Sequence, residues 1–209
     1  GQIYSVNPIA VTPAIAAQIA AAGINGSGIQ SVYFEQNAFD SNTQGIDFVG
    51  TYAHAWEEQL FGYDQSTDVT LGFNLNRYYI SRVKIPNLFT VAQVYNFEHN
   101  TPKWRSVVTL HHQVGPFEAL VRANLFGSYA YTTTTASAFQ QYPAVTPQFD
   151  LEGSYRLDDQ WKFSAGILNV FNRYPDANHI NYAGAGLYVD NGIPWSTGSY
   201  YFVRAQFNL

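Results

Sequence analysis

The chain has 209 residues, of which 46% are hydrophobic, 17% aromatic and only 12% charged, and its formal net charge is −5. Charged residues are about half as frequent as in a soluble globular domain, so part of the surface is expected not to face water. The net charge, without any basic cluster, argues against a nucleic-acid surface. The lack of Cys excludes disulfides, a thiol nucleophile and a cysteine metal site.

The first residues, GQIYSVNP, contain no start methionine, no basic segment and no apolar segment of a signal peptide. This favours a processed mature protein or the tail of a longer one. No apolar stretch reaches the ~20 residues that a membrane helix requires, so a membrane-embedded form of the chain must cross with strands. The segment 1–6 predicts only a strand remnant, because Pro8 follows it.

The alanine-rich segment 13–22 predicts a short helix within a loop. Thr12 is a suitable N-cap, Pro13 occupies the first helical position and Gly23 follows the end. The alternative is an unstructured alanine-rich linker.

The remaining elements alternate with the period of two that is typical of strands. Phe149 to Leu157 is the clearest case, with one apolar face and one polar face. A charged face opposite an apolar face is the pattern of a transmembrane β-barrel with a polar lumen and a lipid exterior. We therefore expect an all-β, antiparallel barrel chain with strands at 32–56, 67–79, 104–114, 117–129, 147–157, 160–171 and 199–209.

The connections between these strands alternate in length. Gly115-Pro116 and Asp158-Asp159 predict tight turns, and 57–66 predicts a third, longer connection on the same side. The segments 80–102, 131–147 and 172–198 are long loops, which are uncommon in compact soluble domains. Short turns at one end and long loops at the other are the outer-membrane arrangement.

Two stretches resemble the C-terminal part of the TonB-dependent outer-membrane receptors. Residues 163–175 (FSAGILNVFNRYP) resemble the penultimate strand of that family, and residues 33–52 (YFEQNAFDSNTQGIDFVGTY) resemble a long strand with a Gly-hydrophobic-acidic signature. The alanine-rich helix ahead of that strand matches one branch of the family. With the terminal strand at 200–209, the resemblance spans nearly the whole chain.

The resemblance implies that residues 1–209 are the C-terminal seven to eight strands of a 22-stranded barrel with a plugged lumen. An isolated barrel of eight strands is not expected, because the eighth strand would be the remnant at 1–6, which is shorter than the ~9–11 residues of a membrane strand. The earlier strands of the receptor, or a second chain, must then close the barrel. The plug domain and the segment that contacts TonB are absent from these residues.

The resemblance also implies a function in the bacterial outer membrane. Such receptors take up a scarce solute, such as a ferric siderophore, a cobalamin-like cofactor or an oligosaccharide, with energy from the TonB system. The expected partners are outer-membrane lipid, the rest of the receptor, TonB and a small-molecule ligand, but no nucleic acid. No covalent chemistry is implied, so neither an enzyme nor a bound cofactor is expected.

The long loops contain the candidate ligand-binding residues. Aromatic rings with polar neighbours are suited to stacking on a sugar ring or a catecholate. The alternative is an aromatic girdle at the membrane surface. The candidates are Tyr142, Tyr182, Tyr188, Trp195, Asp190 and Asn191.

The strands contain the candidate lumen-facing wall. Its charged side chains are expected to form a cross-strand network of opposite charges. The alternative is a glycosidase pair, because Asp150 and Glu152 share a face about 7 Å apart. His111 and His112 point to opposite faces and cannot bind one metal together. The wall candidates are Glu118, Arg122, Asp150, Glu152, Arg156 and Arg204.

Two further functions stay open at this stage. One is a passive porin-like or small adhesive outer-membrane barrel, which an upstream plug domain would exclude. The other is a secreted all-β carbohydrate-binding or hydrolytic domain. That domain would be soluble without detergent, which the apolar faces of the strands disfavour.

Overall fold

In the computed structural model, the described residues are 3–5, 9–32, 35–84, 89–133, 140–179, 187–188 and 197–208. The chain divides into two compact units, Gly1–Asn42 with Tyr79–Thr90, and Thr43–Tyr78 with Val91–Leu209. No helix in these described ranges is both long and apolar enough to cross a lipid bilayer.

The first unit contains helix α1 (Pro13–Ala21) and two small antiparallel strand pairs. Strand β1 (Ile3–Ser5) pairs with β4 (Glu35–Asn37), and β2 (Ile9–Ala10) pairs with β3 (Ser31–Val32). The Thr12 side chain caps α1 by accepting a hydrogen bond from the Ile15 amide at 3.4 Å. Gly23 follows the helix with φ +73°. The predicted helix is confirmed, one residue shorter than expected.

The predicted strand 32–56 is wrong in its first part. The chain there forms β3, β4 and then β5 (Phe39–Ala55), and β3 and β4 pair with different partners. The start of β5 and the end of β6 (Gln65–Val83) belong to the first unit, where Lys84 forms an ion pair with Asp40 at 2.7 Å.

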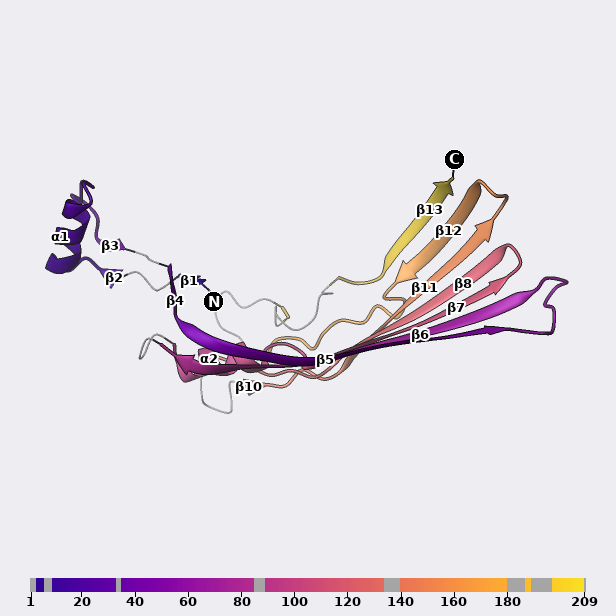
Figure 1. The fold of residues 1–209 in the computed structure, drawn as a ribbon, viewed down its shortest axis with the longest axis horizontal. Coiled ribbons are helices and arrows are strands. Elements are labelled where there is room, and N and C mark those ends of the chain that lie inside the picture. Colours follow the sequence, from indigo (N-terminus) through magenta and orange to yellow (C-terminus); the bar gives the residue numbers. More distant parts are fainter. Residues whose placement is uncertain are drawn as a thin grey trace. The chain divides into compact units, whose positions relative to one another are not determined.

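The second unit is built on a seven-stranded sheet in the order β13-β12-β11-β8-β7-β6-β5 (Figure 1). Every neighbouring pair from β6 to β13 is antiparallel. The all-β antiparallel prediction is confirmed at this level. Closure into a barrel and the total of 22 strands stay predictions. The remaining strands are β7 (Trp104–Val114), β8 (Phe117–Phe126), β11 (Thr146–Arg156), β12 (Trp161–Leu168) and β13 (Tyr200–Phe207).

The pairing register gives this sheet two different faces. Asp150 lies opposite Arg122, and Ser154 lies opposite both Glu118 and Ser164. Across the ladders from β6 to β13, every Asp, Glu, Lys and Arg falls on this side, which we call the charged face. The opposite side, which we call the apolar face, carries Val69, Leu71, Val108, Leu110, Val121, Ala123, Leu151, Ala165 and Val203.

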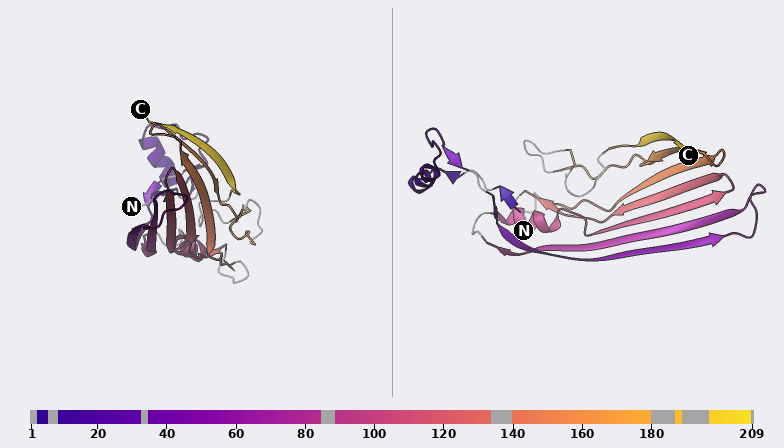
Figure 2. Two further views of the ribbon diagram at one scale, coloured as in Figure 1. Left: turned by 90° about the vertical axis from the view of Figure 1, so that its right-hand side faces the viewer. Right: turned by 45° about the horizontal axis from the view of Figure 1, so that its top comes forward.

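The sheet of the second unit is curved rather than flat (Figure 2). Most side chains on the charged face are buried or half-buried, whereas many on the apolar face are exposed, with Val203 exposed by 87%. This difference is expected if the charged face lies on the inside of the curve. The large exposed apolar area therefore requires a partner other than water.

The connections follow the predicted alternation of short and long. Gly115 forms the β7–β8 turn with φ +53°, and the Asp158 side chain accepts hydrogen bonds from the amides of Gln160 and Trp161 in the β11–β12 turn. The β5–β6 connection, 56–64, is longer.

Several boundaries differ from the sequence prediction: β6 begins at Gln65 instead of residue 67, and β8 ends at Phe126 instead of residue 129. Residues 80–102 were expected to be a loop, but β6 continues to Val83 and helix α2 (Val91–His99) follows. Strand β12 ends at Leu168 instead of residue 171, because Asn169 has a φ of +52° that no strand residue adopts. The segment 131–147 contains the short pair β9 (Tyr131–Thr132) and β10 (Gln140–Gln141).

Candidate ligand site at the loop end of the sheet

Glu118 is the centre of a charged network near the short-turn end of the charged face. Its carboxylate accepts hydrogen bonds from Lys162 Nζ at 2.6 Å, Arg156 at 3.3 Å and His111 Nε2 at 3.3 Å. His111 Nδ1 also lies 3.6 Å from the Asp68 carboxylate. Residues from β6, β7, β8, β11 and β12 are therefore linked across the sheet by side chains as well as by backbone hydrogen bonds.

The other acidic wall candidates have separate partners. Glu152 pairs with Arg204 at 3.4 Å. Asp150 is opposite Arg122 in the ladder, but its carboxylate accepts hydrogen bonds from Asn124 Nδ2 at 3.0 Å and the Asn169 amide at 2.9 Å. All six predicted wall residues share the charged face, and their assignment to a lumen stays a prediction.

The two adjacent histidines do point to opposite faces. His111 belongs to the network on the charged face, whereas His112 contacts Thr67 Oγ1 at 2.8 Å on the other face. Within the described ranges, no group of three or more His, Asp or Glu side chains could hold a metal ion.

The long connections are fastened together by side-chain amides. Asn96 of α2 donates to the Thr132 carbonyl at 2.6 Å and accepts from the Thr132 amide at 2.8 Å. Gln141 donates to the Ala177 carbonyl at 2.7 Å and accepts from the His179 amide at 2.9 Å. These hydrogen bonds join α2 to the residues around Thr132 and join Gln141 to residues 177–179, and we call these joined residues the loop layer.

Tyr142 lies in this layer and is 64% exposed. Its hydroxyl donates to Gln140 at 2.7 Å. Burial raises the pKa of Tyr95, whose ring stacks on His99 at 4.2 Å, and a hydrogen bond with Tyr142 raises this pKa further. Tyr142 thus remains accessible to a ligand next to a second tyrosine.

Tyr188 packs within the third connection, where its ring stacks on Tyr174 at 5.9 Å and its backbone bridges to Ala177. Tyr188 is half-buried, so its ring supports the loop at least as much as it is presented to a ligand. The other four predicted loop residues, Tyr182, Asp190, Asn191 and Trp195, lie outside the described residues.

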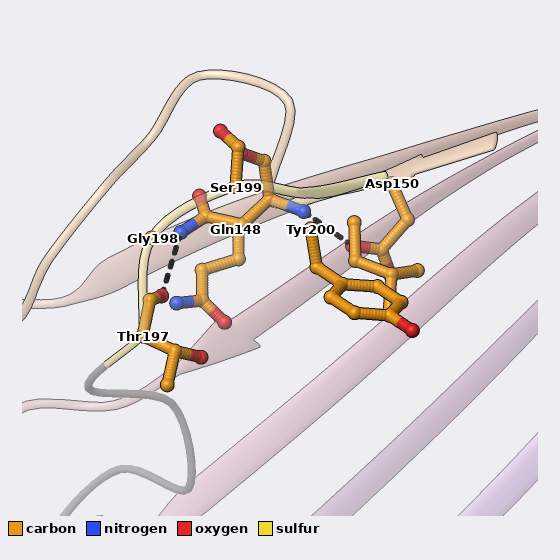
Figure 3. Close-up of a pocket in the computed structure, with 8 residues that line it drawn as sticks. Gln148, Asp150, Thr197, Gly198, Ser199 and Tyr200 are labelled. Carbon is orange, nitrogen blue, oxygen red and sulfur yellow. Dashed lines mark hydrogen bonds between the residues drawn. The ribbon is translucent and has the colours of Figure 1, made fainter. Parts of the chain in front are cut away.

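A pocket of about 380 Å³ opens where β11, β12 and β13 meet this loop layer. Gln148 and Asp150 project from β11 toward the segment 197–200 (Figure 3). Asn169 closes the end of β12, because its side chain bonds both the carbonyl and the amide of Arg173, at 2.7 and 2.8 Å. Ser199 in turn donates its hydroxyl to the Asn169 carbonyl at 2.7 Å.

Gln148 is the unusual member of this pocket. Its side chain is only 2% exposed, and its Nε2 atom has no hydrogen-bond partner among the described residues. Buried amide donors are nearly always paired, because an unpaired donor retains the full cost of losing water. An acceptor that is not among the described residues is therefore expected at this position.

Sequence reasoning did not select Gln148, Asn169, Lys162 or His111 as site residues. Gln148 could have been selected from the sequence, because it lies two residues before Asp150 in β11 and therefore on the same face, which was predicted to be polar. No sequence signal shows that the amide of Gln148 lacks a partner, since that depends on which loop covers the strand end.

No family model matches this sequence, and no curated protein matches it. Among solved structures, one described as copper transporter OprC is similar, with a TM-score of 0.49 and 19% identity over 88% of this chain and 26% of that one. The chain therefore spans about a quarter of the length of the structure it matches. A similarity at this level does not assign a fold or a function.

Proposed function

We propose that these residues form part of the wall of a transmembrane β-barrel in the bacterial outer membrane, within a receptor that takes up a scarce solute. The observation that supports this most is the partition of the sheet into a charged face and an exposed apolar face. In water, such an apolar face would cause aggregation, whereas in a bilayer it is solvated by lipid.

Aromatic pairs bound the apolar face at both ends. At the short-turn end, Phe117 lies 5.0 Å from Tyr155, and Trp161 lies 4.8 Å from Phe207, between ring centroids. At the loop end, Phe73 stacks on Trp104 at 6.3 Å. Aromatic rows at both membrane surfaces are typical of outer-membrane barrels.

The distance between these rows agrees with a bilayer. The 11 residues of β7 run from Trp104 at one row to Val114, the partner of Phe117, at the other. At ~3.3 Å per residue the separation is about 33 Å along the strand. A tilt of ~40° reduces it to about 25 Å, which is the height of the apolar band of such barrels.

The two sheet edges, β13 and β5, support a larger assembly. An unpaired strand edge in lipid leaves backbone groups without hydrogen bonds, which is too costly to persist. Further strands of the same receptor, or a second chain, would pair with these edges. A plug domain and TonB are proposed as the other partners, on the resemblance of residues 33–52 and 163–175 to the family.

In this function the loops capture the solute outside the cell and the strands are the fixed wall around the plug. A ferric siderophore, a cobalamin-like cofactor and an oligosaccharide are the proposed solute classes. No bond of the solute is made or broken, so we propose neither an enzyme nor a resident cofactor.

Adjacent residues on opposite faces test the membrane position. These 209 residues contain no Cys, so a thiol introduced at Val121 or at Arg122 is the one label within them. In lipid vesicles, a fluorophore on V121C should be quenched by spin-labelled lipid, and one on R122C by aqueous iodide. Equal access of iodide to both labels would show that the apolar face is not in lipid.

Conductance separates the receptor from a passive barrel. A plugged receptor should give no steady current in a planar bilayer, whereas a porin-like barrel gives a persistent ohmic current. Loss of solute uptake when TonB is deleted would complete the assignment, and unchanged uptake would contradict energy coupling.

A further inference from the structure

The pocket beside Gln148 offers two kinds of hydrogen-bonding group to an occupant. Gln148 Nε2 is a buried donor without a partner among the described residues, so the occupant has to supply an acceptor. Asp150 supplies the opposite group. One of its carboxylate oxygens accepts a hydrogen bond from the Asn169 amide and the other accepts one from Asn124 Nδ2, and each has a further lone pair for a donor.

The charge of the pocket disfavours an anion. Asp150 is the one charged residue that lines it among the described residues. Arg122 is opposite Asp150 in the β8–β11 ladder, but it does not line the pocket and forms no ion pair with Asp150 in the structure. A phosphate, a carboxylate or an anionic iron chelate would meet this carboxylate without a compensating cation.

Two side chains with large apolar surfaces restrict the shape of the occupant. Leu168 and Tyr200 are direct partners in the β12–β13 ladder and line the same side of the pocket. The ring of Tyr200 is drawn beside Asp150 and below Ser199 in Figure 3. An aromatic ring and a leucine provide a surface for the C–H face of a saturated ring.

We propose that this pocket binds a neutral, hydroxyl-rich ring, that is, one or two sugar units of a saccharide. A sugar hydroxyl can accept a hydrogen bond, as Gln148 Nε2 requires, and can also donate one, as the Asp150 carboxylate requires. The ring carbons pack on Tyr200 and Leu168. The volume of about 380 Å³ lies at the lower end of the range for small-molecule sites. This inference rests on the proposed function and selects one of its three solute classes.

Saturation-transfer NMR on the full-length protein in detergent tests the proposal. The probes are a panel of neutral sugars, comprising glucose, galactose, mannose, xylose, N-acetylglucosamine and the α- and β-linked glucose disaccharides, with citrate and inorganic phosphate as anionic probes. At least one sugar should give a signal and a measurable Kd, and neither anion should displace it. A protein that binds no sugar of the panel, or whose sugar is displaced by citrate or phosphate, overturns the proposal.

Gln148→Leu should weaken the sugar Kd at least tenfold. Gln113→Leu is the matched control, because Gln113 lies on the same face at the short-turn end and its Nε2 is already bonded to the Gly115 carbonyl. Unchanged binding by Q148L would overturn the proposal. If Q148L does not fold, Tyr200→Ala replaces a side chain that is 62% exposed, and the same weakening is expected of it.

The V121C and R122C labels distinguish a failure of the sugar proposal from a failure of the proposed membrane function. A protein that shows the lipid and iodide pattern but binds no sugar retains the membrane function and loses only the sugar site. A protein whose labels are both reached by iodide loses the membrane function, whatever it binds.

Discussion

Replacing Glu118 by Gln should destabilise the sheet more than the same change at any other acidic wall residue. The Glu118 side chain is only 12% exposed and accepts hydrogen bonds from three cationic or imidazole groups. A hydrogen bond to a charged group contributes about 1.5–3 kcal/mol, and a solvent-exposed ion pair about 0–1 kcal/mol. Because Lys162 is close and half-buried whereas Arg156 is half-exposed, we expect a loss of about 2 kcal/mol, chiefly through Lys162.

Glu152→Gln is the matched control on the neighbouring strand. Glu152 has one ion-pair partner, Arg204, at 3.4 Å, and that arginine is 56% exposed. Its loss should be below about 1 kcal/mol. The measurement is the free energy of unfolding by guanidinium in lipid vesicles, followed by tryptophan fluorescence.

A double-mutant cycle then identifies the dominant partner. The coupling of Glu118 with Lys162 should be about 1 kcal/mol or more, and that with Arg156 about 0.5 kcal/mol or less. Equal losses for E118Q and E152Q, or a stronger coupling to Arg156, would refute the reasoning that burial and distance set the strength of this network.

Three further changes have defined outcomes. Gly166→Ala should unfold more easily by about 1 kcal/mol, because its Cβ would lie 2.8 Å from the backbone carbonyl oxygen of Leu151. Gly153→Ala, with open space around its Cβ, should not be destabilised, and equal melting temperatures of the two variants would contradict this. Gly115→Ala should cost about 1–2 kcal/mol from its positive φ alone, plus a clash with the Tyr63 ring, and an unchanged denaturant midpoint would be inconsistent with this turn. Asn96→Ala removes both bonds to Thr132, so limited proteolysis should cut α2 faster while the sheet stays protected; unaltered cleavage would mean that other contacts hold the loop layer.

Much of the fold follows from local patterns. The alternation in β8, β11, β12 and β13 predicted which side chains share a face, because strand side chains alternate regardless of the strand's partners. Thr12, Pro13 and Gly23 predicted the ends of α1 for a similarly local reason, since capping involves groups within one turn. The turn at Asp158 is likewise local, because its side chain bonds the amides of Gln160 and Trp161.

Helix α2 was missed although Thr90 precedes its first residue and Gln93 follows Thr90 by three positions, which is the spacing of a capping box. Its contacts with the connection around Thr132 hold it in place, and these join segments 36 residues apart. In the predicted strand 32–56, β3 and β4 pair with β2 and β1, whereas β5 joins the seven-stranded sheet next to β6, so partners distant in sequence decide which sheet each part joins.

The candidate site depended most on tertiary structure. The sequence by itself determined that Glu118, Asp150 and Glu152 share one face, since that requires only parity. Only the register decided that Glu118 collects three partners and that Asp150 is held by amides, because a shift of two residues keeps the parity and changes every neighbour. Only the return of the chain at 197–200 made Gln148 a buried donor without a partner, since burial of one strand end depends on a loop distant in sequence.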